Sequence, residues 1–160
     1  MAQRISSSLV ELTVLAFWLG AAGFLSVAVA PALFAALPTR ELAGVVIGRV
    51  LPGLFYSGMI VGVLVMVIEV VSRGVWSWRG REMFGLLIVV SCVIAQGFIA
   101  PRIARLRDEI AGPIEALPAD DARRVAFGRL HGASVAWLGA AMLAAVITLV
   151  LTARTLRSRD

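Results

Sequence analysis

The stretch ALPTRELAGVVIGRV (Ala36–Val50) recurs 80 residues later, without a gap, as ALPADDARRVAFGRL (Ala116–Leu130). Alanine, leucine, proline, valine, glycine and arginine coincide in the two copies. A weaker match joins APALFAAL (Ala30–Leu37) to APRIARLR (Ala100–Arg107), 70 residues further on. An internal repeat fixes the layout of a fold. We therefore expect two similar halves, at about residues 9–72 and 83–155.

Long, almost uncharged stretches flank the two copies. They are Leu12–Arg40, Val50–Ile68, Met83–Pro101 and Gly132–Ala153. Each is long enough to cross a hydrocarbon core of about 30 Å at about 1.5 Å per helical residue. Hydrophobic residues make up 60% of the chain and its mean hydropathy is +0.93, which is far more apolar than soluble domains. The sequence predicts an all-α integral membrane protein, with four transmembrane helices in one domain spanning residues 1–160.

Two spans in each half make each half a helical hairpin. The first and third helices then point the same way, so the halves are parallel repeats related by a pseudo-two-fold axis along the membrane normal. Within each repeat copy, Thr39 or Asp120 is the expected N-cap of the second helix, and Glu41 or Asp121 lies in its first turn.

The connection between the third and fourth helices, Arg102–Arg124, is the longest non-membrane segment. Its run RIARLRDEI is amphipathic, with Ile103, Leu106 and Ile110 on one face. We expect an amphipathic helical connection here. Three environments stay open for it: the headgroup region, a partner protein, or solvent as a cap on the bundle.

Charge indicates the partners and the orientation. The net charge of +5 comes from fifteen arginines and ten acidic residues, almost all at span ends or between spans. This pattern favours a membrane surface, and no basic face with interleaved aromatic residues predicts a nucleic-acid partner. The arginines on the side of both termini sit in short segments beside span ends. We therefore expect both termini in the cytoplasm, with the chain in a bacterial-type inner membrane.

Small residues recur every four positions along the fourth helix. They are Gly128, Gly132, Ala136, Ala140 and Ala144. Helices associate in lipid through close backbone contact at such faces. The stripe predicts packing within the bundle, with other membrane subunits or with a second copy of the chain.

No catalytic signature is present: the sequence has no Gly-rich phosphate loop, no Cys-x-x-Cys and no pair of histidines. We therefore expect no enzymatic activity and no catalytic residues, and the sequence specifies no metal and no cofactor. Candidate site residues are instead the polar groups at membrane depth, where such groups are costly.

Arg49 and Arg129 occupy matched positions at the mouths of the second and fourth helices. With Arg102 and Ser134 they form a candidate polar mouth for an anion, a lipid phosphate or a carboxylate. The alternative is that each arginine extends to the interface, or pairs with the acidic residue two turns earlier, Glu41 or Asp121.

His131 is the single histidine of the chain, and its repeat counterpart is Leu51. Three roles stay open: a ligand to haem, a chlorophyll-type pigment or a metal ion; a proton carrier; or a hydrogen-bond donor to a neighbouring carbonyl.

Three further polar residues lie in or beside the spans. Gln96 faces Ser26 under the repeat and is expected to bridge helices. Glu69 precedes Arg73 by one turn, which predicts an interfacial ion pair. Glu11 opens the first helix, and a proton-coupled transporter has a use for either carboxylate.

In order along the chain, the motifs APALFAALP, GRVLP, APRIARLR and FGRLHGAS resemble the domain-of-unknown-function family numbered 4149, which includes proteins similar to transmembrane protein 205. The resemblance runs over nearly the whole chain and implies four membrane helices of unknown biochemistry. Positions matching the motifs of the family are Pro31, Arg49, Pro101, Arg102, Arg129, His131 and Ser134. Many members carry an asparagine where this chain has Leu138, which weighs against a polar pathway into the bundle.

The first functional hypothesis is a non-enzymatic accessory or scaffold subunit of a membrane complex or homo-oligomer. A transporter or channel element for a metal ion, proton or small solute is the second. A subunit that binds haem or a chlorophyll-type pigment through His131 is the third.

Overall fold

The computed structural model describes residues 2–73, 80–110 and 112–157, and all of its regular elements are helices. In chain order these are α1 (Ala2–Phe24), the π-turn η1 (Leu25–Val29), α2 (Ala30–Ala36), α3 (Arg40–Arg73), α4 (Glu82–Val93), the π-turn η2 (Ile94–Ile99), α5 (Ala100–Asp108), the 3₁₀ turn η3 (Ile114–Ala116) and α6 (Ala122–Arg157). The predicted all-α fold class is confirmed.

Four continuous helical segments are long and apolar enough to cross a membrane, as predicted. They are Ser6–Ala36, Arg40–Val71, Glu82–Asp108 and Ala122–Arg157. The last three run past both ends of the corresponding uncharged stretch, because a helix does not stop where the first charged side chain appears. The first begins before Leu12 and ends at Ala36, short of Arg40. Exposed apolar side chains such as Phe17 and Val27 lie along these spans, as expected for helices in contact with lipid.

A π-turn precedes the Ala-Pro pair in both hairpins. In η1 the Ala30 N–H donates to the Leu25 carbonyl, and in η2 the Ala100 N–H donates to the Ala95 carbonyl, five residues back in each case. Proline has no N–H and its ring crowds the preceding turn. The wider π-turn makes room for that ring, so the helices continue through Pro31 and Pro101. The same local structure at equivalent places agrees with the predicted repeat.

The predicted end of the third helix at Pro101 is therefore wrong. The helix runs on as α5 to Asp108, so residues 102–108 of the amphipathic run prolong the membrane-spanning rod. Helix α5 packs on α6, Ile110 is buried, and Leu106 is half-buried. The apolar face of this run is used inside the protein, and the true connection is only the segment from Glu109 to Asp121.

Capping residues start the second helix of each hairpin. Thr39 is the N-cap of α3, as predicted, since its Oγ1 accepts the Leu42 N–H at 3.2 Å. Asp121, not Asp120, caps α6, because its Oδ1 accepts the Arg123 N–H at 2.8 Å. The sequence offers two adjacent aspartates, and only the cap geometry separates them.

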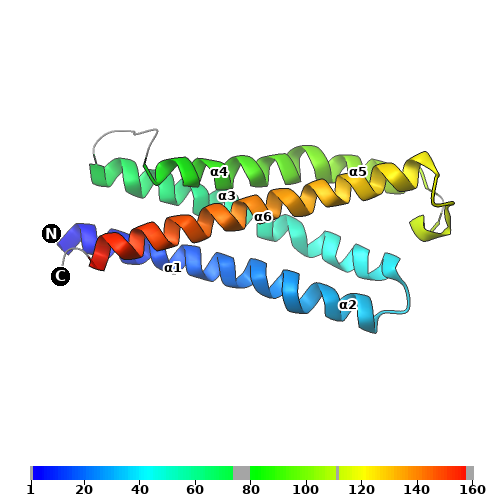
Figure 1. The fold of residues 1–160 in the computed structure, drawn as a ribbon, viewed down its shortest axis with the longest axis horizontal. Coiled ribbons are helices and arrows are strands. Elements are labelled where there is room, and N and C mark those ends of the chain that lie inside the picture. The colour runs from blue at the N-terminus through cyan, green and yellow to red at the C-terminus, as the bar shows by residue number, and fades with distance from the viewer. Residues whose placement is uncertain (1, 74–79, 111, 158–160) are drawn as a thin grey trace.

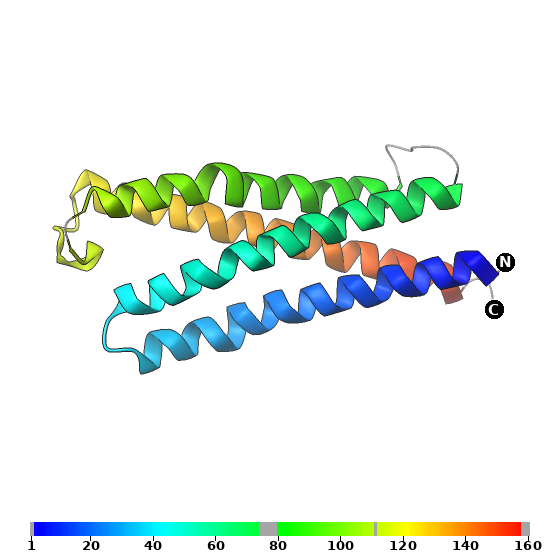
Figure 2. The ribbon, with the colours of Figure 1, turned by 180° about the vertical axis from the view of Figure 1, so that it is seen from behind.

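The four rods form an up-down-up-down bundle (Figure 1). Helices α3 and α6 each pack against both α1 and α4. Both termini lie at one end, which we call the termini end, together with the end of α3 and the start of α4 (Figures 1 and 2). At the opposite end, which we call the connection end, α2 packs on α3 and α5 packs on α6. The two pairs are set apart there in both views.

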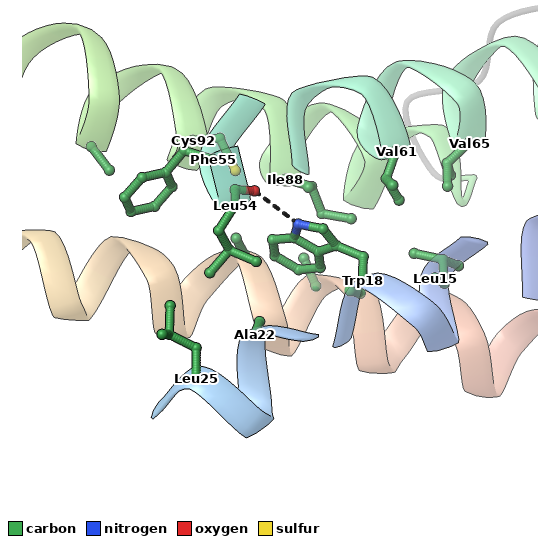
Figure 3. Close-up of a cluster of buried hydrophobic side chains, with 14 residues drawn as sticks. Leu15, Trp18, Ala22, Leu25, Leu54, Phe55, Val61, Val65, Ile88 and Cys92 are labelled. Atoms are coloured by element: carbon green, nitrogen blue, oxygen red, sulfur yellow. Dashed lines mark hydrogen bonds between the residues drawn. The ribbon is translucent and has the colours of Figure 1, made fainter. Parts of the chain in front are cut away.

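The core is built around Trp18, whose side chain is 2% exposed. Its Nε1–H donates to the Leu54 carbonyl at 3.0 Å (Figure 3). The indole lies against Gly58, where an added Cβ would be 2.9 Å from the ring and 2.7 Å from Cys92 Sγ. Glycine at position 58 is thus what lets a tryptophan of α1 reach the backbone of α3.

Helices α3 and α4 touch backbone to backbone near the termini end. A Cβ added at Gly62 would lie 2.7 Å from the Gly85 carbonyl oxygen, and one added at Gly85 would lie 2.9 Å from the Gly62 carbonyl oxygen. Reciprocal glycines of this kind allow close helix contact in lipid. The bundle is therefore tightest on the side of the termini.

Candidate functional site

Ionisable side chains gather inside the bundle at the termini end. Glu11, Glu69 and Glu82 directly adjoin the predicted apolar stretches, since they stand next to Leu12, Ile68 and Met83. The up-down topology brings these span ends together with the end of α6. All three glutamates are buried, with at most 1% exposed.

A connected network joins three helices through one guanidinium group. Arg81, just before α4, forms an ion pair with Glu69 of α3. Its Nη1 donates to Thr152 Oγ1 of α6 at 2.8 Å. Thr152 Oγ1 lies 2.9 Å from Glu11 Oε1 of α1. These four residues, Glu11–Thr152–Arg81–Glu69, form what we call the buried network.

Thr152 has two acceptors for its one hydroxyl proton. Glu11 Oε1 and the Thr148 carbonyl oxygen both lie 2.9 Å from Thr152 Oγ1. The hydroxyl oxygen can accept two hydrogen bonds and donate one. If Glu11 is ionised, Thr152 donates to it; if Glu11 is protonated, Glu11 donates to Thr152, which donates to Thr148. Either protonation state is accommodated without repacking.

Burial leaves part of the network without hydrogen-bond partners among the described residues. Glu11 is 0% exposed and its Oε2 has no partner, and the buried Nε of Arg81 has none either. A buried polar atom without a partner is costly, and its presence calls for a physical explanation.

Glu82 lies in the first turn of α4. Its carboxylate folds back over Gly80, where no Cβ would fit. The N-terminal end of a helix carries partial positive charge, which stabilises a carboxylate in this position. The start of α4 therefore stabilises the negative charge of Glu82 separately from Arg81.

The predicted partner of Glu69 was Arg73, whose side chain lies outside the described residues. The structure adds an ion pair with Arg81, which sequence reasoning missed together with Thr152 and Glu82. One signal was available. The charged residues that border the spans on the side of the termini must converge in an up-down bundle, whichever residues pair.

The residues of the candidate polar mouth lie towards the connection end. Arg49, Arg102 and Arg129 are exposed, and none makes a hydrogen bond or ion pair within the described part of the chain. The suggested pairing of Arg129 with Asp121 is wrong, because Asp121 binds Arg123. Ser134 is half-buried. The alternative that the arginines extend to the interface fits this exposure.

The Asp121–Arg123 pair is an exposed cap at the start of α6. Arg123 donates to Asp121 Oδ2 from Nη2 at 2.8 Å and to Oδ1 from Nε at 3.1 Å. This side-chain hydrogen bonding, followed by the Arg123 backbone N–H, lowers the pKa of Asp121 from 3.8 to about 2. The pair caps the start of α6, and Asp121 therefore pairs with Arg123 and not with Arg129.

His131 is exposed on α6, and its ring stacks on Phe127 with 6.2 Å between centroids. No three His, Cys, Asp or Glu side chains among the described residues are grouped so as to hold a metal ion. Its roles as a metal or pigment ligand and as a proton carrier stay predictions, which the visible absorption spectrum of the native protein would test for the pigment. Gln96 is half-buried within η2.

The small-residue stripe of α6 divides into two parts. Ala144 is buried in the core and Ala140 is half-buried, whereas Gly128, Gly132 and Ala136 are exposed. A Cβ added at Gly128 or Gly132 would meet nothing within 4 Å. The predicted packing inside the bundle thus holds for the second half of the stripe, and the first half is uncovered.

Comparison with known proteins gives one family. A family model described as a domain of unknown function (DUF4149) matches residues 13–111. The match takes in Glu69, Arg81 and Glu82, whereas Glu11, Thr152 and the Arg-Leu-His-Gly motif of α6 lie outside it. No curated protein and no solved structure matches the chain.

Proposed function

The chain belongs to the DUF4149 family, whose description gives no activity, and we propose that this membrane protein binds and exchanges protons at Glu11. This is the transporter-or-channel hypothesis, with the proton as the ion. The single observation that supports it best is the fully buried Glu11 carboxylate, which has a hydrogen-bonding hydroxyl on one oxygen and, among the described residues, no hydrogen-bond partner on the other.

The surroundings of the three buried carboxyl groups favour a proton on Glu11. Ionised groups are rarely buried without compensation, and a carboxyl group becomes neutral instead. Arg81 compensates Glu69, and the start of α4 compensates Glu82. Among the described residues, Glu11 has a neutral hydroxyl group as its hydrogen-bond partner and reaches Arg81 only through that hydroxyl, so we assign the proton to Glu11.

The two acceptors of Thr152 support exchange over permanent protonation. The hydroxyl group can serve either form of Glu11 by turning between Glu11 and the Thr148 carbonyl. Carboxyl groups inside the membrane often belong to proton relays. With both termini in the cytoplasm of a cell with a bacterial-type inner membrane, the buried network lies near the cytoplasmic face. The proposal includes no enzymatic activity.

Proton flux into liposomes tests this function. The whole chain is reconstituted with a pH-sensitive dye inside, and a membrane potential is imposed. Wild type should acidify the lumen faster than empty liposomes. Glu11→Gln should fall to the rate of empty liposomes, because an amide keeps the Thr152 hydrogen bond and carries no exchangeable acid proton.

Glu115→Gln is the matched control, since Glu115 is exposed in η3 and the same chemical change is made there. It should leave the flux unchanged. Equal flux in wild type and Glu11→Gln would reject the proposed site. A wild-type flux no greater than that of empty liposomes would reject proton transport.

A second candidate is assembly, as an accessory or scaffold subunit or a homo-oligomer. The uncovered glycines of α6 favour it, because a second α6 at the same depth would fill the open space beside Gly128 and Gly132. Gly132→Leu should abolish energy transfer between labelled copies in a bilayer. Gly53→Leu, at another exposed glycine with nothing within 4 Å, should preserve it, and equal transfer in both variants would argue against this interface.

A further inference from the structure

Arg107 is the last arginine of α5, and its side chain reaches across to α3. A Cβ added at Gly44 would lie 2.9 Å from Arg107 Nη2, and one added at Gly48 would lie 3.8 Å from Nη1. The guanidinium carbon also lies 5.4 Å from the centroid of the Phe127 ring of α6. Three helices, α3, α5 and α6, thus surround one guanidinium group.

The surrounding residues contact the Arg107 guanidinium but accept no hydrogen bond from it. The ring face of Phe127 attracts the cation but accepts no conventional hydrogen bond, and glycine leaves room without supplying an acceptor side chain. Arg107 is half-buried and has no hydrogen bond or ion pair within residues 2–73, 80–110 and 112–157. A guanidinium group has five N–H donors. The cradle therefore presents a cation whose N–H donors have no acceptor among the described residues.

Nearby arginines differ from Arg107 in this respect. Arg123 is bound to Asp121, and Arg124 donates to the Leu117 carbonyl at 2.7 Å. Arg102 and Arg105 are exposed on the same helix as Arg107. Arg107 is the one of these whose guanidinium is both held between helices and left without an acceptor.

We propose that Arg107, in the cradle formed by Gly44, Gly48 and Phe127, binds the phosphate group of an anionic membrane phospholipid. Guanidinium and phosphate match in charge and in bidentate geometry. Helix α5 prolongs a membrane span and ends at Asp108, so the guanidinium lies where phospholipid headgroups are found. The lipid is the source of phosphate that is always present at this depth.

Native mass spectrometry of the full chain in neutral detergent tests the site, with phosphatidylglycerol as the probe and phosphatidylcholine as the neutral reference. Phosphatidylglycerol should bind more tightly than phosphatidylcholine. Arg107→Gln should weaken phosphatidylglycerol binding about tenfold, as expected for loss of one bidentate charge-assisted contact. Arg105→Gln removes the same charge from the same helix and should change the binding by less than about twofold.

A second pair of variants keeps every charge in place. Gly44→Ala pushes on Arg107 Nη2, the movable end of a long side chain, and should weaken the lipid complex. Gly53→Ala, where nothing lies within 4 Å, should not. Equal effects of Arg107→Gln and Arg105→Gln, or of the two alanine variants, would overturn the cradle. Displacement of phosphatidylglycerol by inorganic phosphate would reject a phospholipid as the ligand and indicate a soluble anion.

Discussion

Arg81 at the termini end has opposite surroundings to Arg49 and Arg129 towards the connection end. At the termini end, Arg81 is enclosed by three helices and binds Glu69 and Thr152. At the connection end, Arg49 and Arg129 are exposed without partners in the described chain. A charge inside the bundle must be compensated by protein, whereas a charge at the lipid interface is compensated by water and headgroups. The comparison predicts very unequal responses to the same substitutions.

Loss of Arg81 should have the largest effect on stability. Arg81→Gln removes a cation that pairs with the buried Glu69 carboxylate, and removing one partner of a buried pair costs about 3–5 kcal/mol. Unfolding in mixed micelles measures it. Arg49→Gln should stay within about 0.5 kcal/mol of wild type.

A double variant separates the charge from the packing. Adding Glu69→Gln to Arg81→Gln should recover part of the lost stability, because the buried group that pairs with Arg81 then carries no charge. If Arg81→Gln and Arg49→Gln cost the same, the termini end does not depend on a buried charge.

The close contact of α3 and α4 should give the next largest effect. In Gly62→Ala the new Cβ meets the Gly85 carbonyl oxygen at 2.7 Å, and backbone cannot move aside cheaply. Overpacking of this kind costs about 1–3 kcal/mol, measured by the same unfolding assay. Gly53→Ala, in open space on the same helix, should not destabilise the protein. A neutral Gly62→Ala would contradict the backbone contact.

A smaller, local effect of pH is expected at the start of α6. Because the folded pKa of Asp121 is about 2, below its ordinary 3.8, its ionised form stabilises the cap above about pH 3.8. That contribution disappears as the pH falls towards 2. The protection of the Arg123 amide, which is its exchange rate compared with that of an unfolded peptide at the same pH, should fall over this range. Asp121→Asn has no charge to titrate, so its exchange at Arg123 should show no such step, and a step of equal size would assign the titration elsewhere.

The smallest effect on stability is expected for His131→Ala. The ring is exposed and its one described contact is the stack on Phe127. The unfolding free energy should change by no more than about 0.5 kcal/mol. A loss comparable to that of Arg81→Gln would mean that the connection end has a buried polar contact of its own.

The sequence predicted the number of spans, the hairpin layout and the Thr39 cap because these depend on local pattern. It placed the end of the third helix at Pro101 because charged residues begin at Arg102, and a π-turn that carries the helix through Pro101 leaves no clear local signature. The buried network could not be predicted from the sequence for another reason. Thr152 and Glu11 are 141 residues apart, and which face each helix turns inward depends on packing of the whole bundle.

Infrared difference spectroscopy of the purified protein tests the central claim most directly, because it observes the proton on the carboxyl group. Wild type should show a protonated-carboxyl C=O band that fades as the pH is raised, and Glu11→Gln should lack that band while Glu115→Gln keeps it. An identical pH-dependent band in wild type and Glu11→Gln would show that the exchangeable proton does not reside on Glu11.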